Sequence, residues 1–226
     1  RRGRAPAADR RRAIVVLRAE TRLRQLEETL FQTLGPAPSP RTIFILGAPR
    51  TGSTVFYQAL TTAFGLPFLS NFANDQTRET PIIGILASYG LPIREGDRFS
   101  SAYGKSRGRH AHSEGSAIVS LWCGGGHPSE TVSSEVLPDQ VAHMRATLAA
   151  VEAEIGRPLV IKNCWNCFRI ASLAEHFPDA SFIWIRRDVV DAARSDLAAR
   201  LTVQGDAQIW NSATPRNVEE LRKLPP

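Results

Sequence analysis

The sequence lacks long hydrophobic runs and has few cysteines. No stretch approaches the roughly 18 uninterrupted apolar residues of a membrane-spanning helix, and the first residues lack the pattern of a secretory signal peptide. The three cysteines, Cys123, Cys164 and Cys167, cannot all pair with one another. With no secretory signal, the three cysteines are expected to be free thiols, as is usual in a reducing compartment. These absences predict a soluble, cytoplasmic protein.

Lysine is also scarce, and positive charge is concentrated at one end of the chain. Only three of the 28 basic residues are lysines. Nine arginines against Asp9 and Glu20 give residues 1–24 a formal charge of +7, which leaves −1 for residues 25–226 out of the total of +6. A nearly neutral body excludes nucleic acid as the expected partner. The basic segment 1–24 is a candidate for contact with a membrane surface or an acidic partner.

The length of 226 residues, with 42% hydrophobic and 22% charged residues, is that of a globular protein with a substantial core. Apolar residues at three- and four-residue spacing predict an amphipathic helix over residues 10–34. The prolines of residues 36–40 end that helix, because proline disfavours a helical residue before it. We therefore divide the chain into a basic tail with a helix, residues 1–40, and a domain of residues 41–226.

Strand and helix patterns alternate in that domain. Short apolar runs predict strands at residues 42–46, 159–162 and 181–186. Helical spacing predicts helices at residues 53–64, 139–155, 167–177 and 188–201. Residues 65–138 are rich in Gly, Ser and Pro, with short helical stretches around residues 78–88 and 114–122, as is typical of a region that shapes a substrate site. The alternation predicts a three-layer α/β/α fold with a central parallel sheet.

A glycine-containing loop follows the first predicted strand and precedes a helix. Its sequence is Gly47-Ala48-Pro49-Arg50-Thr51-Gly52-Ser53-Thr54. The spacing is that of a phosphate-binding loop, but Ser53 stands where nucleotidases have lysine, and the loop's cation is Arg50. The N–H groups of residues 51–54 converge at a helix N-terminus in such a loop, where they bind an anion. The pattern predicts a phosphate ligand different from that of nucleotidases.

A second candidate anion site follows the last predicted strand. Arg187 ends that strand, and Ser195 lies eight residues further on in the next helix. A residue at the carboxyl end of a strand and one about two turns into the following helix face the same crevice of an open α/β sheet. A guanidinium and a hydroxyl together suit a phosphate monoester.

Together these motifs resemble the sulfotransferases that use 3′-phosphoadenosine 5′-phosphosulfate. That family has a Pro-Lys/Arg-x-Gly-Thr/Ser-Thr loop, matched here by residues 49–54, and an Arg with a Ser eight residues later, matched by Arg187 and Ser195. The runs Lys162-Asn163 and Phe177-Pro178-Asp179-Ala180-Ser181-Phe182-Ile183 are similar to further family motifs. The resemblance covers about residues 42–66 and 158–200. Val189 and Cys164 stand where the family usually has proline, and we expect the domain of residues 41–226 to lack its C-terminal part.

The resemblance implies transfer of a sulfuryl group from 3′-phosphoadenosine 5′-phosphosulfate to a hydroxyl or amine by in-line displacement, with no metal. It places the 5′-phosphosulfate against Arg50, Thr51, Gly52, Ser53 and Thr54 and the 3′-phosphate against Arg187 and Ser195. Lys162 is expected near the bridging oxygen as electrophilic assistant. Candidate general bases lie in the middle region: Glu114 first, His112 second, then Glu79 and His127.

The acceptor stays open as a small molecule, a lipid or a carbohydrate. The middle region supplies five candidate aromatic residues for its pocket: Phe68, Phe72, Tyr89, Phe99 and Tyr103. Apolar and sugar-bearing acceptors are both compatible with them.

Four other interpretations compete with sulfuryl transfer. Cys164-Trp165-Asn166-Cys167 follows a predicted strand, as a thioredoxin-like redox pair does, and His110 with His112 forms a possible metal pair. A P-loop kinase or nucleotide phosphotransferase is opposed by Ser53 in the lysine position. A non-catalytic nucleotide-binding module with a basic docking helix is the alternative from a different class.

Overall fold

The computed structural model describes residues 7–34, 38–123, 138–210 and 217–224. The chain forms two compact units, Arg1–Pro36 and Ala37–Pro226. The first unit is built on the helix α1 (Ala7–Leu34), which covers the predicted helix and begins three residues earlier. Its threonines Thr21, Thr29 and Thr33 each donate their hydroxyl to the carbonyl four residues before, as is common within helices. In the described part of the chain no helix is long and apolar enough to cross a membrane.

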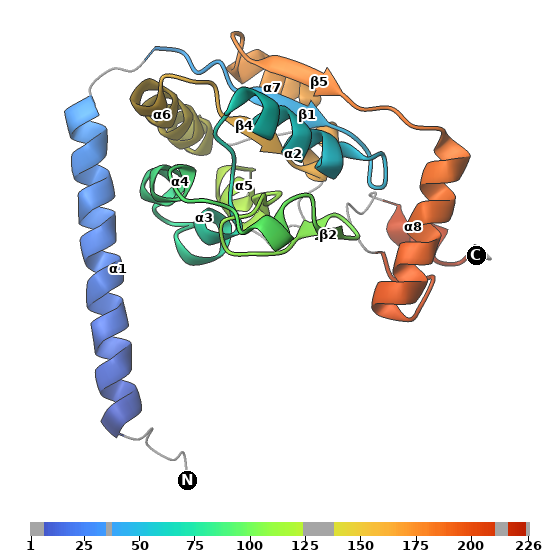
Figure 1. Ribbon diagram of the computed structural model, residues 1–226, viewed down its shortest axis with the longest axis horizontal. Helices are drawn as coiled ribbons and strands as arrows, with labels where there is room; N and C mark the ends of the chain where they lie inside the picture. The colour runs from blue at the N-terminus through green and yellow to red at the C-terminus, as the bar shows by residue number, and fades with distance from the viewer. Residues whose placement is uncertain (1–6, 35–37, 124–137, 211–216, 225–226) are drawn as a thin grey trace. The chain divides into compact units, whose positions relative to one another are not determined.

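The second unit is built around a parallel sheet (Figure 1). Its strands are β1 (Ile43–Leu46), β4 (Val160–Lys162) and β5 (Ser181–Trp184), in the order β4-β1-β5. Ile43 of β1 pairs with Val160 on one side and with Ser181 on the other. Because the three strands run parallel, their carboxyl ends meet at one edge of the sheet, where open α/β sheets bind ligands.

Helices flank the sheet, and together they confirm the predicted α/β class with a central parallel sheet. The α-helices of this unit are α2 (Ser53–Phe64), α3 (Asn71–Gln76), α4 (Pro81–Tyr89), α5 (Ser116–Cys123), α6 (Pro138–Ile155), α7 (Ile170–His176), α8 (Val189–Gln204) and α9 (Val218–Leu221). The shorter elements are the 3₁₀-helices η1 (Glu95–Asp97) and η2 (Cys164–Phe168) and the hairpin strands β2 (Ser101–Ala102) and β3 (Lys105–Ser106).

The core lies where the sheet and the helices meet. Phe44 on β1 is fully buried and contacts Phe177 edge-to-face and Phe182 in a stacked arrangement. The helices α4 and α5 both pack against α6, whose buried residues include Met144 and Leu148. Burial of such large apolar side chains is the main favourable term in folding. It fixes the strands whose ends carry the site.

Helix ends follow capping rules that can be read from the residues. Ser70 begins α3 by accepting a hydrogen bond from the Ala73 N–H, and Asp188 begins α8 by accepting from the Val190 and Asp191 N–H groups. Ser70 therefore fixes the start of α3, and Asp188 fixes the start of α8 directly after Arg187.

The predicted regular elements of the domain recur with small shifts at their ends, and the middle region contains more structure than its composition indicated. The helix α3 and the β2–β3 hairpin were not predicted. The predicted helix over 167–177 is divided into the end of η2 and α7. The helix α3 and the β2–β3 hairpin line the cavity described next, whereas η1 and α9, also not predicted, do not.

Candidate active site

A cavity of about 1060 Å³ opens at the carboxyl ends of β1 and β4. Its walls come from the loop after β1, from α3, from the β2–β3 hairpin, from residues 108–116 and from the first residues after β4. Segments far apart in the sequence therefore meet around one space. Eight of the predicted site residues line it: Arg50, Gly52, Ser53, Thr54, His112, Glu114, Lys162 and Arg187. Ser195 contacts the lining residue Arg50, and Thr51 donates its hydroxyl to the Ala48 carbonyl within the loop.

The loop of residues 47–54 has a backbone shaped for an anion. Arg50 has a φ of +67° and Gly52 a φ of +87°, so two residues of the loop lie in the left-handed region. A non-glycine residue pays for that conformation in strain, which is typical of functional sites. A Cβ on Gly47 would meet Thr51 Oγ1 at 2.8 Å, so any side chain there would displace the Thr51 hydroxyl. No side chain caps the start of α2, which leaves its first N–H groups available to a ligand.

The two predicted anion anchors are in contact. Arg50 Nε donates to Ser195 Oγ at 3.1 Å. Arg187 donates from its guanidinium to the Arg50 carbonyl at 3.0 Å. The Arg50 guanidinium also lies over the ring of Tyr103, 5.3 Å from its centroid. Arg50, Arg187 and Ser195 thus form one cationic cluster beside the loop, although Arg50 is 137 positions or more from the other two in the sequence. Such a cluster is suited to phosphate oxygens.

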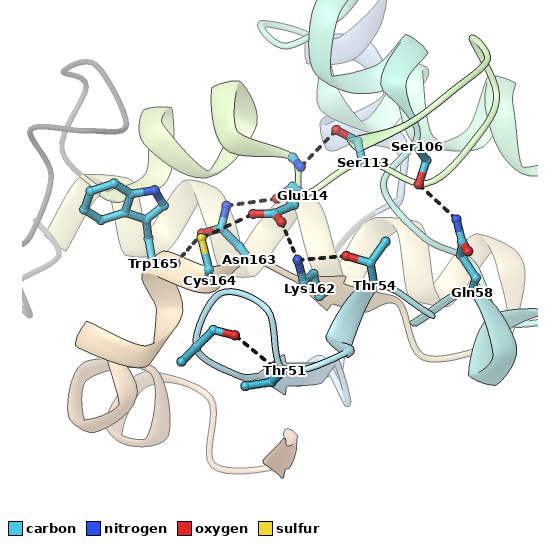
Figure 2. A network of polar contacts seen from close by, with 12 residues as sticks. Thr51, Thr54, Gln58, Ser106, Ser113, Glu114, Lys162, Asn163, Cys164 and Trp165 are labelled. Carbon is cyan, nitrogen blue, oxygen red and sulfur yellow. Dashed lines mark hydrogen bonds and ion pairs between the residues drawn. The ribbon is translucent and has the colours of Figure 1, made fainter. Parts of the chain in front are cut away.

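A carboxylate and an ammonium group lie on the next part of the wall (Figure 2). Lys162 ends β4, is nearly fully buried, and forms an ion pair with Glu114. Lys162 Nζ also donates to Thr54 Oγ1 of the loop at 3.3 Å. The register explains this approach, because Lys162 pairs with Ile45, two residues before the loop begins at Gly47. One ammonium group therefore connects the loop to the carboxylate.

Two neighbours hold Glu114 in place, as Figure 2 shows. Asn163 Nδ2 donates to the Glu114 carbonyl at 2.9 Å, while Asn163 Oδ1 accepts from the Trp165 N–H at the start of η2. Cys164 donates its thiol to Glu114 Oε2 at 3.3 Å. After Glu114, Gly115 turns the chain into α5 with a φ of +64°, and a Cβ there would clash with Leu69.

Most of the chain matches a known protein family. A family model described as Sulfotransferase family matches residues 40–224. The chain belongs to the sulfotransferase family. Among curated proteins and among solved structures no significant match is found. The match confirms the predicted family and covers nearly all of the α/β unit of this sulfotransferase, including the middle region that carries Glu114.

His112, the second candidate base of the sulfotransferase, lies on the cavity wall but is directed into the protein. It is 5% exposed, and its Nε2 is 2.6 Å from Thr61 Oγ1. Its ring stacks on Phe68 with centroids 3.8 Å apart. Burial lowers the pKa of His112 to about 4, because desolvation disfavours the imidazolium. The imidazole is thus neutral at pH 7 and held by packing.

The remaining candidates of the sulfotransferase lie elsewhere. Glu79 is exposed in the turn before α4 and does not line the cavity. His127 lies outside the described residues. Within the described residues there is no group of three or more His, Cys, Asp or Glu side chains arranged to hold a metal ion. All three cysteines are free, and burial raises the pKa of the Cys123 and Cys167 thiols.

Several site residues of the sulfotransferase were not predicted from the sequence. Asn163 and Cys164 touch Glu114, and Asn71 donates its amide to the carbonyls of Ser106 and Gly108 at 3.1 and 2.8 Å, which ties α3 to the segment after β3. A signal existed for Cys164, because it stands two residues after Lys162, where the family motif has proline. No signal existed for Asn71, since its partners are backbone groups.

Proposed function

We propose that this sulfotransferase moves a sulfuryl group from 3′-phosphoadenosine 5′-phosphosulfate to a hydroxyl group of its acceptor. The observation that carries the proposal is the Thr54–Lys162–Glu114 network, which joins an anion-binding loop to a carboxylate within one cavity. In-line transfer needs charge stabilisation on the leaving phosphate and a base for the acceptor. The network brings candidates for both tasks together.

The residues fit the proposed donor at both of its charged ends. The free N–H groups at the start of α2 and the Arg50 side chain would hold the 5′-phosphosulfate. Arg187 and Ser195 would hold the 3′-phosphate, since a guanidinium and a hydroxyl can each donate to phosphate oxygens. Their contacts with Arg50 support one binding surface for both groups.

Glu114 is the favoured general base. Its side chain is 28% exposed and lines the cavity, whereas His112 is almost fully buried and paired with Thr61. A base must reach the acceptor proton directly or through one water. The bond between sulfur and the bridging oxygen breaks, the acceptor oxygen bonds to sulfur, the acceptor proton goes to Glu114, and 3′-phosphoadenosine 5′-phosphate leaves with the electron pair.

Lys162 supplies positive charge where negative charge develops. Its ammonium group is nearly inaccessible to solvent and already bonds the loop through Thr54. In a site shielded from water, a fixed cation stabilises an anionic leaving group more strongly than it would in bulk solvent. Glu114 balances that charge until the donor binds.

The place of action that we propose is the cytoplasm. Support comes from three free cysteines, two of them buried, which are the usual state of thiols in a reducing compartment. The arginine-rich residues 1–24 remain a proposed contact for an acidic membrane surface or partner, on the strength of their charge alone. Nucleic acid is not proposed as a partner, because the rest of the chain is nearly neutral.

Calorimetric titration with 3′-phosphoadenosine 5′-phosphate tests the donor assignment without needing an acceptor. We expect binding that weakens at least tenfold with 5′-AMP, which lacks the 3′-phosphate, and with the Arg187→Ala variant. Arg186→Ala is the matched control, because Arg186 lies over Trp184 and does not line the cavity. Binding of ATP with magnesium in place of the bisphosphate would overturn the proposal and favour a kinase.

A further inference from the structure

We infer that the acceptor of this sulfotransferase is a polyhydroxylated molecule of the sugar type, and not a phenol, a sterol or a long-chain alcohol. The inference rests on the proposed function and names the substrate class of the same site. It is carried by the side chains that line the acceptor part of the cavity and by the hydrogen-bonding atoms that they leave available.

The acceptor part of the cavity is defined by Glu114 and Lys162. On one side of this pair lie the 47–54 loop and Arg187, the proposed donor contacts. The remaining lining residues come mainly from α3 and from residues 101–116. Because the reacting hydroxyl must reach Glu114, the acceptor occupies the space beside those two segments.

Few aliphatic side chains line that space. Among the described residues around the cavity there is no Leu, Ile, Phe or Met, and Pro49 and Val55 belong to the loop and to α2. Three aromatic side chains also line the cavity, and each of them is buried or has an arginine over its ring: Tyr103, Trp165 and Trp210. Pockets for apolar ligands are lined mainly by hydrophobic side chains. A phenol or an alkyl chain that leaves water for a wall of amides and charged groups gains little free energy of binding, because it buries little apolar surface against apolar surface.

Four of the five candidate aromatic residues do not line the cavity. Phe68 packs on His112, and Phe72 lies under the Arg109 guanidinium, 4.5 Å from it. Tyr89 donates its hydroxyl to the Gly65 carbonyl, and Phe99 is exposed away from the cavity. Tyr103 does line the cavity, with Arg50 over its ring. An aromatic acceptor pocket is therefore not built from these residues.

The helix α3 instead presents groups that suit hydroxyls. Asn71, Asn74, Asp75 and Gln76 all line the cavity. Asp75 accepts from Asn74 Nδ2 through one oxygen, at 2.7 Å, and Gln76 Oε1 accepts from Arg109 at 2.9 Å. Within the described part of the chain, the second oxygen of Asp75 and the amide nitrogen of Gln76 make no hydrogen bond. The cavity wall therefore offers one hydrogen-bond acceptor and one donor from consecutive residues of α3.

That pair matches the chemistry of adjacent hydroxyl groups. A hydroxyl both donates and accepts, so neighbouring hydroxyls can donate to a carboxylate and accept from an amide at the same time. A site built to hydrogen-bond such groups rejects analogues that lack them, because its own polar atoms would lose their partners. We therefore assign the hydroxyls that do not react to Asp75 and Gln76.

The test compares two acceptor classes with ³⁵S-labelled 3′-phosphoadenosine 5′-phosphosulfate. Methyl β-glucoside and maltose represent polyhydroxylated acceptors, and 2-naphthol and 1-octanol represent apolar ones. We expect labelled sulfate on the glycosides, with kcat/KM at least tenfold above that of the apolar set. Saturation-transfer NMR on the same four compounds, in the presence of 3′-phosphoadenosine 5′-phosphate, reports binding independently of turnover.

Variants assign the selectivity to α3. Asp75→Ala should lower kcat/KM for the glycosides by 10- to 100-fold and leave donor-product binding unchanged. Asp75→Asn keeps the volume and one carbonyl oxygen and should lower it less. Asp179→Ala, at an exposed position outside the cavity, should behave as wild type.

The two proposals fail in distinguishable ways. If 3′-phosphoadenosine 5′-phosphate binds and naphthol or octanol is preferred, or if no glycoside gives turnover or an NMR signal, the acceptor class is wrong and the donor assignment stands. If the bisphosphate itself does not bind, the proposed function is wrong. A glycoside preference that Asp75→Ala leaves intact would also overturn the role assigned to α3.

Discussion

The ion pair between Lys162 and Glu114 makes a prediction that needs no acceptor. Glu114→Gln keeps the side-chain shape and removes the charge opposite an ammonium that is 6% exposed. Removing one partner of a fully buried pair costs about 3–5 kcal/mol, because a buried charge is left uncompensated. Since Glu114 is 28% exposed, water solvates part of the site, and we expect a loss of about 1–3 kcal/mol in the free energy of unfolding.

A double-mutant cycle measures the pair itself. Lys162→Met removes the ammonium, and combining it with Glu114→Gln leaves no charge to compensate. The double variant should therefore lose less stability than the two single losses together, by about 1 kcal/mol or more. Urea unfolding followed by tryptophan fluorescence gives each value. The difference should persist in 1 M salt, because buried pairs are screened less than exposed ones.

An exposed pair provides the control. Glu219 and Arg222 lie 2.5 Å apart with side chains 75% and 43% exposed. Glu219→Gln should change stability by no more than about 0.5 kcal/mol. The argument that each residue compensates the charge of the other would be refuted if the stability losses of the Lys162 and Glu114 variants were strictly additive. An interaction energy in the cycle no larger than the stability change at the exposed pair would also refute it.

Three further predictions concern the same unit. The free energy of unfolding should fall by about 2–3 kcal/mol between pH 7 and pH 4 through His112, because its pKa drops from 6.5 to about 4 on folding. The stabilisation present above pH 6.5 is therefore lost as pH falls. In urea unfolding, His112→Gln should make stability depend less on pH over that range, and an unchanged pH dependence would contradict the prediction. Asp188→Ala should lower stability by about 1 kcal/mol through loss of the α8 cap, while Asp188→Asn keeps most of it; equal melting temperatures for the two would count against the cap. Arg50→Gly should be more stable than Arg50→Ala by about 0.5–1 kcal/mol, because only glycine accepts a φ of +67° without strain; calorimetry should show weakened binding of 3′-phosphoadenosine 5′-phosphate in both, and equal stabilities would argue against strain at residue 50.

The sheet and the loop could be predicted because their information is local. The apolar runs of β1 and β4 and the spacing of Gly47 and Gly52 identify elements without knowledge of their partners. The proximity of Lys162 to Thr54 also follows from sequence, since parallel strands bring their carboxyl ends together.

The acceptor side could not be predicted in the same way. Asn71 and Asn163 donate to backbone carbonyls of distant segments, and a sequence carries no trace of such partners. The burial of His112 depends on Phe68 and Thr61, which other elements bring to it. Short elements such as α3, six residues long, give too few turns for a periodic pattern.

The position of β1 in the centre of the sheet has a consequence for biosynthesis. Ile43 is made early, but its partner Val160 lies more than half the chain further on, and Ser181 lies later still. At about 5–20 residues per second, the nascent strand waits several seconds or longer for either neighbour. During that time both edges of β1 lack the strands that pair with them, which makes the emerging chain a candidate client for chaperones. Pairings of such long sequence separation also slow folding, so the sulfotransferase gains its catalytic geometry only after β5 has left the ribosome.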